Sequence, residues 1–237
     1  KIDLSVDWHQ QVESGIPATR INTYLGPSEP NADPRFKNGK PYVHPINYGF
    51  NYGSWLIYDP ESGASGDGPF QINRTTRLGD VRDGLSNTLC ASEVKAYTSY
   101  IRNAEVDPGS QAPEEVDFFQ GVSGQYKLGP ALEENTGHTV WPDGRVHHAG
   151  FTTVYTPNRF IPFRQGQRVF DIDYNSWQEG RSDSRASYAA ITVRSYHAGL
   201  VNTLWMDGSV QVITDRIELR VFRALGTVAG QEWVTLD

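Results

Sequence analysis

The stretch YAAITVRSYHAGLVNTLWMDGSVQVIT, residues 188–214, constrains the fold more than any other part of the chain. Apolar and polar residues alternate through it, a pattern typical of half-buried β-strands. Asp207-Gly208 separates two apolar runs, which favours a two-residue hairpin turn with positive φ at both central residues. The pattern Trp-x-Asp-Gly-x-Val recurs at residues 141–146 and predicts a second hairpin, with its turn at Asp143-Gly144. A sheet is therefore the expected framework.

The remaining segments predict short elements. The chain of 237 residues has 23 glycines and 14 prolines, which indicates many turns rather than long helices. Residues 77–97 predict one helical turn, a break at Asp83-Gly84 and then a buried strand, and residues 215–232 predict a helix that stops at Gly226. Further expectations are a short strand at 21–25 and loop insertions at about 103–135 and 158–185. Since no linker divides the sequence, residues 1–237 are predicted to form a single α+β domain with an antiparallel sheet, long loops and few short helices.

Charge and hydropathy narrow the functional classes. The net charge is -7 and the mean hydropathy is -0.52. No basic face is apparent, which argues against nucleic acid as a partner. The sequence has no run of 18 apolar residues, so no membrane span is predicted. Cys90 is the single cysteine, which excludes an intrachain disulfide.

His197 and Asp207 could serve chemistry or architecture. A carboxylate beside an imidazole suits a general base, but it equally suits a structural hydrogen bond. No Gly-x-Ser-x-Gly elbow or activated cysteine supplies a nucleophile for such a base. We therefore favour the structural interpretation and predict no catalytic residue. Asp207 should lie in a hairpin turn, and His197 should be at least partly buried with a hydrogen-bond partner.

Metal sites are weakly indicated. His147-His148 is an adjacent pair whose side chains would point to opposite faces of a strand, and no His-Glu-x-x-His motif is present. Oxygen-rich clusters give weak calcium candidates at Asp83, Asp171 and Asp173, although no full calcium-loop pattern follows them. In the stretch RDGLSNT, we instead expect Asp83-Gly84 to form a turn, with the Ser86 or Asn87 side chain bonding local backbone. No cofactor is predicted, with calcium as the minority alternative.

Several stretches together resemble one family. HAGLVNTLWMDGSV has a histidine, nine residues and then Asp207-Gly208, which resembles the H-X9-DG motif of the prepilin-type processing-associated proteins, the DUF1559 family, abundant in planctomycetes and related bacteria. VRDGLSNTLCASEVKAYTSYIR, which contains Gly84 and Glu93, is similar to another segment of that family. The same holds for INTYLGPSEP, GHTVWPDGRVHHAGFTTVYTPN and FRALGTVAGQE.

The resemblance implies a pilin- or pseudopilin-like domain, extracytoplasmic and non-catalytic, at the cell surface or in the periplasm. It implies a role in filaments or a type II secretion-like system, through self-association or other pilin-like subunits. The family's long N-terminal helix is not in this sequence. An apolar stripe on the sheet should then be covered by another copy or by residues 1–20, where Ile2, Leu4, Val6 and Trp8 alternate like a strand.

Two alternatives stay open. A binding module for glycan or another surface polymer would use exposed tryptophan and tyrosine rings, of which the chain has six and twelve. A secreted hydrolase would use His197 as its base. A row of exposed aromatic side chains beside a groove would favour the binding module. A pocket bringing His197 within reach of a serine, threonine or acid other than Asp207 would favour the hydrolase.

Overall fold

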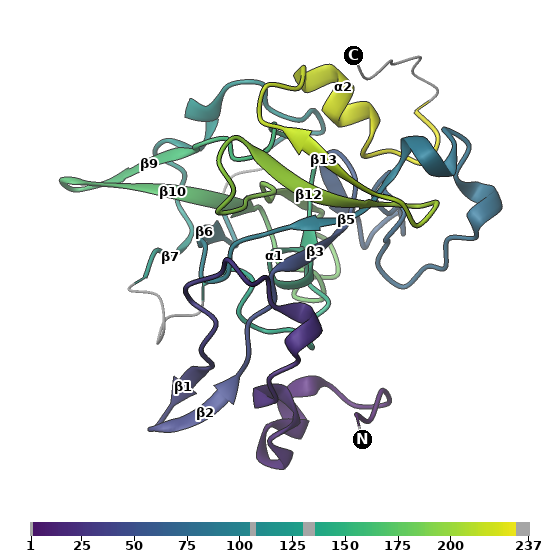
Figure 1. Ribbon diagram of the computed structural model, residues 1–237. Coiled ribbons are helices and arrows are strands. Elements are labelled where there is room, and N and C mark those ends of the chain that lie inside the picture. Colours follow the sequence, from purple (N-terminus) through teal and green to yellow (C-terminus); the bar gives the residue numbers. More distant parts are fainter. Residues whose placement is uncertain (1, 105–107, 130–135, 231–237) are drawn as a thin grey trace.

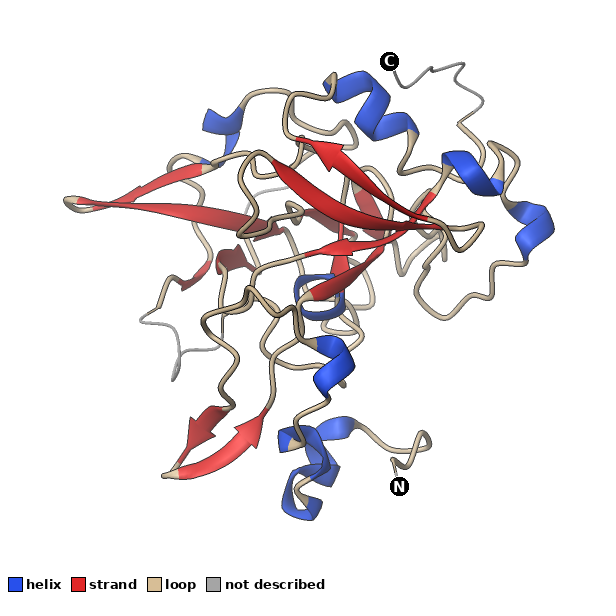
Figure 2. Ribbon diagram, viewed as in Figure 1, coloured by secondary structure: helices blue, strands red, loops and turns tan. Residues whose placement is uncertain are grey.

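The computed structural model describes residues 2–104, 108–129 and 136–230, and its architecture is β-rich. Three sheets carry the described chain, while the helices are short and mostly of the 3-10 type (Figures 1 and 2). The predicted α+β class with few short helices is confirmed. The strand pairing is mixed rather than purely antiparallel, because two strand pairs run parallel.

The five-stranded sheet has the order β13-β12-β5-β3-β8. Its strands are β3 (Tyr48–Asn51), β5 (Leu89–Glu93), β8 (Gly150–Phe151), β12 (Leu200–Trp205) and β13 (Val210–Thr214). On the inner face, Val201, Trp205 and Ile213 pack against helix α2 (Leu219–Ala224), which contributes Phe222. Because only one face is packed in this way, the opposite face of β12 and β13 is left facing outward (Figure 1).

The six-stranded sheet has the order β4-β11-β10-β6-β7, and β9 forms a hairpin with β10. Its strands are β4 (Leu56–Tyr58), β6 (Ser99–Arg102), β7 (Gln125–Lys127), β9 (Pro162–Gln165), β10 (Arg168–Asn175) and β11 (Ser187–Ala190). The hydrophobic core beside this sheet includes Ile101, Ile172 and Tyr174. The ring centroids of Phe119 and Tyr174 lie 4.6 Å apart. The central strand β10 therefore joins the hairpin to the buried core.

The smaller elements lie around the two sheets. A two-stranded ribbon is formed by β1 (Arg35–Lys37) and β2 (Lys40–Val43), and helix α1 spans Val146–Ala149. The 3-10 helices are η1 (Trp8–Ser14), η2 (Ile16–Ala18), η3 (Asn22–Tyr24), η4 (Leu78–Asp80), η5 (Leu85–Asn87) and η6 (Val116–Phe119). In Figure 1 the ribbon and the first two 3-10 helices gather at the N-terminal end of the molecule.

The structure confirms the predicted strands within 188–214, the strand after Asn87 and the C-terminal helix before Gly226. The strand expected at 21–25 is wrong, because Asn22–Tyr24 forms a 3-10 turn. The loop insertion expected at 158–185 is also wrong, since it holds the β9-β10 hairpin. The other insertion, 103–135, includes η6 and β7, and residues 105–107 and 130–135 lie outside the described chain.

The N-terminal alternation does not form a strand. Asp7 accepts a hydrogen bond from the His9 N–H at 2.7 Å and begins helix η1 there. Leu4, expected to help cover the sheet, is 93% exposed. Such local bonds from side chains to the backbone compete with extended structure, which explains why the alternation of apolar and polar residues does not produce a strand here.

Candidate functional site

His197 pairs with Glu93 rather than with Asp207. Its Nε2 lies 3.3 Å from Oε1 of Glu93, whose other oxygen accepts the Asn202 N–H at 2.8 Å. The His197 side chain is 41% exposed, more open than the sequence predicted, whereas that of Glu93 is 10% exposed. Glu93 ends β5, so the pair ties the segment before β12 to the neighbouring strand.

Asp207 lies in the hairpin between β12 and β13, as predicted, but in a three-residue turn. The Gly208 N–H bonds the Trp205 carbonyl and the Trp205 N–H bonds the Ser209 carbonyl, both at 2.9 Å. Only Gly208, at φ 87°, is left-handed, which identifies a type I turn followed by a glycine bulge. The Ser209 N–H donates to Asp207 at 2.8 Å and lowers the pKa of that carboxyl.

The two family motifs meet at this turn. The Asp207 N–H donates to the Leu85 carbonyl at 3.1 Å, and the Met206 N–H donates to the Thr88 carbonyl at 3.0 Å. Both acceptors belong to the stretch DGLSNT, so these backbone bonds fasten the H-X9-DG hairpin to it. The histidine and the aspartate therefore frame one strand, each with partners of its own.

Asp83 fastens the same stretch to the C-terminal segment. Its Oδ2 accepts the Thr227 hydroxyl at 2.9 Å and the Gly230 N–H at 2.8 Å. Gly84 has φ 99°, and the Asn87 amide donates to the Asp83 carbonyl at 3.0 Å, as expected for the turn. No hydrogen bond of the described residues involves the Ser86 side chain, which is exposed. Asp83 and its neighbours thus act structurally here.

Asp143-Gly144 does not form the predicted hairpin. Asp143 instead accepts the Arg145 N–H at 3.0 Å, and helix α1 begins directly afterwards at Val146. Pro142 stands where the true hairpin has Met206, and proline has no N–H for the bond that Met206 donates. The predicted hairpin is therefore wrong, because a helix follows the turn and the next strand, β8, has only two residues.

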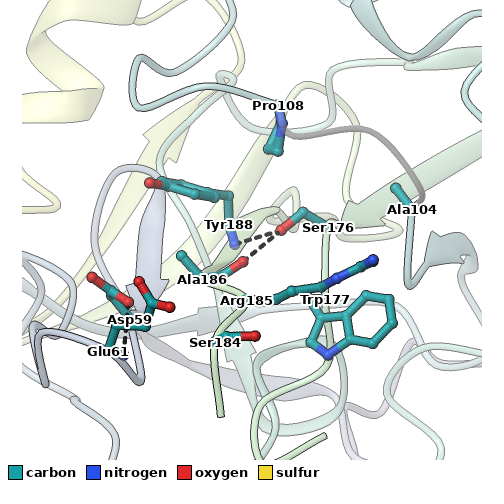
Figure 3. Close-up of a pocket in the computed structure, with 10 residues that line it drawn as sticks. All are labelled: Asp59, Glu61, Ala104, Pro108, Ser176, Trp177, Ser184, Arg185, Ala186 and Tyr188. Atoms are coloured by element: carbon teal, nitrogen blue, oxygen red, sulfur yellow. Dashed lines mark hydrogen bonds between the residues drawn. The ribbon is translucent and has the colours of Figure 1, made fainter. Parts of the chain in front are cut away.

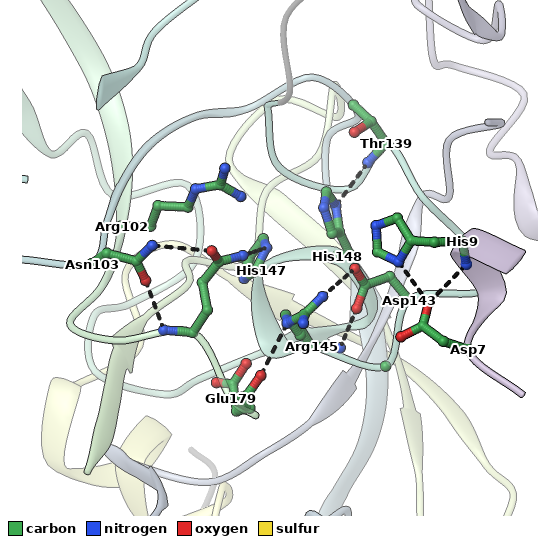
Figure 4. Close-up of polar contacts among 12 residues, drawn as sticks. Asp7, His9, Arg102, Asn103, Thr139, Asp143, Arg145, His147, His148 and Glu179 are labelled. Atoms are coloured by element: carbon green, nitrogen blue, oxygen red, sulfur yellow. Dashed lines mark hydrogen bonds and ion pairs between the residues drawn. The ribbon is translucent and has the colours of Figure 1, made fainter. Parts of the chain in front are cut away.

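Three histidines are buried around α1. His138, His147 and His148 are at most 2% exposed, and the rings of His147 and His148 lie 4.4 Å apart (Figure 4). His148 Nδ1 accepts the Thr139 N–H at 3.4 Å, and His138 Nδ1 contacts the His148 carbonyl at 3.0 Å. Burial lowers the pKa of all three, to about 4 for His138. They are therefore neutral at pH 7.

Asp171 and Asp173, the other calcium candidates, both face a buried arginine. Arg194 lies 3.1 Å from Asp171 and forms an ion pair with Asp173. Burial opposes the charge of Arg194, but the two carboxylates outweigh it and raise its pKa. Within residues 2–104, 108–129 and 136–230, no group of three or more histidine, cysteine or acidic side chains is placed to hold a metal. The absence of a cofactor stays a prediction, with calcium as its alternative, and calorimetric titration with Ca²⁺ after chelation tests it.

Sequence reasoning missed Glu29 and Arg194. Glu29 Oε2 accepts the Asn47 amide at 2.6 Å and the Ala96 N–H at 3.0 Å, joining the stretch LGPSEP to the end of β5. The Arg194 N–H bonds the Glu93 carbonyl at 3.1 Å. Each is a charged residue in an irregular segment whose partners are remote in sequence. Only the family resemblance around Glu29 singled out that stretch.

The outward face of β12 and β13 exposes two valines. Val210 is 70% exposed and Val212 is 54% exposed, and they lie opposite Leu204 and Asn202 on β12. Phe50 on β3 is 40% exposed on the same face, because it pairs with Ala91, which pairs with Leu204. Neither β12 nor β13 carries a charged residue, and β13 is the end strand of its sheet. This face and edge form the sheet surface discussed below.

A groove of about 430 Å³ lies beside β11 (Figure 3). Trp177 and Tyr188 contribute rings to it, and Asp59 and Glu61 contribute carboxylates. The Arg185 guanidinium lies 4.4 Å from the centre of the Trp177 ring and covers one of its faces. Rings beside carboxylates could bind a saccharide, so the groove relates to the polymer-binding alternative.

We expect His197→Ala to lower stability only slightly. A half-exposed ion pair contributes about 0.2–1 kcal/mol, which corresponds to a fall in melting temperature of about 2–4 °C or less for a chain of this size. Glu93→Ala should cost more, because it also leaves the Asn202 N–H without its acceptor. Calorimetric melting of both variants provides the check. A His197→Ala variant that unfolds at room temperature would refute the assignment.

Comparison with known proteins identifies a family. A family model described as "Protein of unknown function (DUF1559)" matches residues 1–220. No curated protein matches the chain, and no solved structure matches it. None of the helices in the described part of the chain has the length and apolar character needed to cross a membrane.

Proposed function

Because the chain belongs to the DUF1559 family, we propose that it is a non-catalytic, extracytoplasmic structural protein of the pilin or pseudopilin kind. It acts through self-association or surface presentation, with further copies or other pilin-like subunits as partners. The observation that supports this proposal is the sheet surface formed by the outward face and open edge of β13.

An uncharged edge strand favours pairing with another chain. End strands present unpaired N–H and C=O groups, and monomeric proteins commonly protect them with lysine, proline or a bulge. β13 reads VQVIT and has no charged residue and no proline. Val210 and Val212 also expose apolar surface that association would remove from water. The open edge of β13 and its exposed valines therefore both favour association with another chain.

The simplest arrangement is a two-fold pairing of β13 with β13 of a second copy. Antiparallel pairing around Val212 would continue the five-stranded sheet across both copies and place the two valine faces side by side. Residues of one copy would then contact the same residues of the other. A further contact elsewhere on the molecule would be needed to extend such a pair into a filament.

The oligomeric state tests this proposal. Sedimentation equilibrium over a series of protein concentrations should show a mass that rises toward the dimer. Val210→Lys combined with Val212→Lys should weaken association by about tenfold or more, because like charges would face each other across the pair. The matched control is Val169→Lys on β10, a valine that is 43% exposed away from this surface. A wild-type protein that stays monomeric throughout would exclude the proposal.

Polymer binding is the second candidate, and the groove beside β11 favours it. We propose that a saccharide would stack on Trp177 or Tyr188 and bond the carboxylates of Asp59 and Glu61. Calorimetric titration with soluble polysaccharides tests this, with Trp177→Ala expected to abolish binding and Trp141→Ala to leave it intact. Equal binding by the wild type and Trp177→Ala would remove the groove from consideration.

The hydrolase alternative requires a pocket at His197 and a serine, threonine or acid other than Asp207 within reach of that side chain. An acid other than Asp207 does lie within reach of His197, namely Glu93. A cavity of only about 10 Å³ lies beside Glu93 and Ser195, and His197 is not among the described residues that line it. The Ser195 hydroxyl donates to the Leu200 carbonyl at 2.6 Å. Since no nucleophile is presented to His197 here, the non-catalytic proposal is preferred.

A further inference from the structure

A small polar chamber lies between η1, the β1-β2 ribbon, β6 and the start of α1. It has a volume of about 100 Å³, and its described lining includes Arg35, Arg102, Arg145, Arg181, His148 and Asp143. Trp8 and His9 of η1 close one side, with their rings stacked 3.7 Å apart. The N-terminal segment, expected to cover a sheet, therefore covers this chamber instead.

The chamber concentrates positive charge in an acidic protein. Four arginines and one aspartate line it, although the whole chain has a net charge of -7. Among the described residues, the one ion pair between lining side chains is Asp143 with Arg145, at 3.0 Å. Arg102 donates to the Gln125 amide oxygen and the Tyr100 hydroxyl, both neutral groups. Since no carboxylate among the described residues pairs with Arg102 or Arg181, these two side chains give the lining an excess of positive charge.

Two acids of the described chain, Glu179 and Asp7, lie near the chamber without lining it, and both interact electrostatically with Arg145. Glu179 is buried next to the chamber, but its carboxylate accepts bonds from Ser187 and Asn175, and Arg145 bonds only its backbone carbonyl. Asp7 lies outside the lining, where it bonds His9 at 2.6 Å. Guanidinium groups clustered around a partly enclosed space repel one another, which favours the binding of an anion there.

The donors come from several directions. Arg102 comes from β6, Arg145 from the residue before α1 and Arg181 from the segment before β11, while Figure 4 shows His148 between Arg102 and His9. His148 Nδ1 accepts the Thr139 N–H, so the neutral ring carries its proton on Nε2 and is a donor there. Donors spread around a compact space match the oxygens of a tetrahedral anion, and guanidinium groups bind such oxygens in pairs.

We propose that this chamber binds a small oxyanion of the phosphate or sulfate class, held chiefly by Arg102, Arg145 and Arg181 with His148 as a neutral donor. The volume exceeds that of a single buried water, which needs about 10–15 Å³ on the same measure, so an anion with few remaining waters fits. A free inorganic anion and the ester group at the end of a sulfated or phosphorylated saccharide both present such oxygens, so the chamber could recognise either one.

Calorimetric titration of the full chain with sodium sulfate, sodium phosphate and glucose 6-sulfate tests the proposal. Chloride at matched ionic strength serves as the blank. At least one of the three should bind with one-to-one stoichiometry. Binding by the inorganic anions identifies a free ligand, whereas binding by glucose 6-sulfate alone identifies an ester.

Two arginine variants locate the site. Arg102→Gln and Arg181→Gln should each weaken binding by about tenfold, the loss of one charge-assisted contact. Arg181 is exposed, so its variant is expected to fold even if Arg102→Gln does not. Arg164→Gln and Arg168→Gln, on the exposed β9-β10 hairpin, are matched controls that should bind within twofold of the wild type. Absence of heat with all three anions, or equal binding by Arg181→Gln and the controls, would overturn the proposal.

Discussion

Lowering the pH from 6 to 5 should destabilise the protein by several kcal/mol. His138, His147 and His148 are buried and neutral, and burial lowers the pKa of His138 to about 4. In the unfolded chain a histidine titrates near pH 6.5. The unfolded state therefore takes up protons first as the pH falls, so the stabilisation is present above about pH 6.5 and is lost below it.

The slope of the free energy of unfolding against pH follows from the number of protons that the unfolded state binds in excess of the folded state. Each histidine that stays neutral contributes about 1.4 kcal/mol per pH unit, so the three together contribute about 4 kcal/mol. Glu179 acts in the opposite direction, because burial raises its pKa and favours its protonated form in the folded state. Urea denaturation at each pH gives the free energy of unfolding that this prediction concerns.

Variants separate the histidines from other titrating groups. His147→Gln and His148→Gln should each remove about one third of the slope, because both side chains are buried. A free energy of unfolding that does not change between pH 7 and pH 5 would show that the cluster is not buried in solution.

The second large effect is expected at Arg194. Arg194→Met should cost about 3–5 kcal/mol, because it leaves the buried Asp173 carboxylate without its ion pair. The double variant Arg194→Met with Asp173→Asn should recover part of that loss, since no uncompensated charge then remains. Chemical denaturation of the wild type, both single variants and the double variant completes the cycle.

A matched control uses an exposed pair of the same kind. Arg220 lies 2.9 Å from Glu218, with side chains 83% and 68% exposed. Arg220→Met should therefore change stability by about 1 kcal/mol or less. Similar losses for Arg194→Met and Arg220→Met would contradict the burial of the Arg194 pair.

The comparison of WMDGSV with WPDGRV shows how far the sequence could predict this fold. Both have the hairpin pattern, but only Met206 can donate the N–H that fastens the turn to Thr88. Pro142 lacks that donor, and Asp143 instead bonds the Arg145 N–H just before α1. The Trp-x-Asp-Gly-x-Val pattern is compatible with a hairpin at both places. The bond from the Met206 N–H to the Thr88 carbonyl distinguishes them, and it involves a distant segment that the local pattern does not contain.

Strand β10 was missed for a related reason. Its sequence, RVFDIDYN, contains two aspartates, which suggested a polar loop. Arg194 neutralises both from a remote segment and lets Asp173 be buried in the sheet. The polar chamber was hidden in the same way, because its arginines come from four separate parts of the chain. Local sequence patterns therefore predicted many of the strands and short helices. The burial of Asp173 and the position of the polar chamber depend on charged residues from distant segments, which local patterns do not reveal.

Cysteine cross-linking at β13 tests self-association most directly. Cys90 is the only cysteine, so a Cys90→Ala background allows one new thiol to be placed at Val212. Two-fold pairing of β13 predicts that Val212→Cys forms a disulfide-linked dimer under mild oxidation, while Val169→Cys, at a similarly exposed position on β10, does not. A Val212→Cys protein that stays monomeric, or cross-links no faster than Val169→Cys, would contradict assembly through this edge.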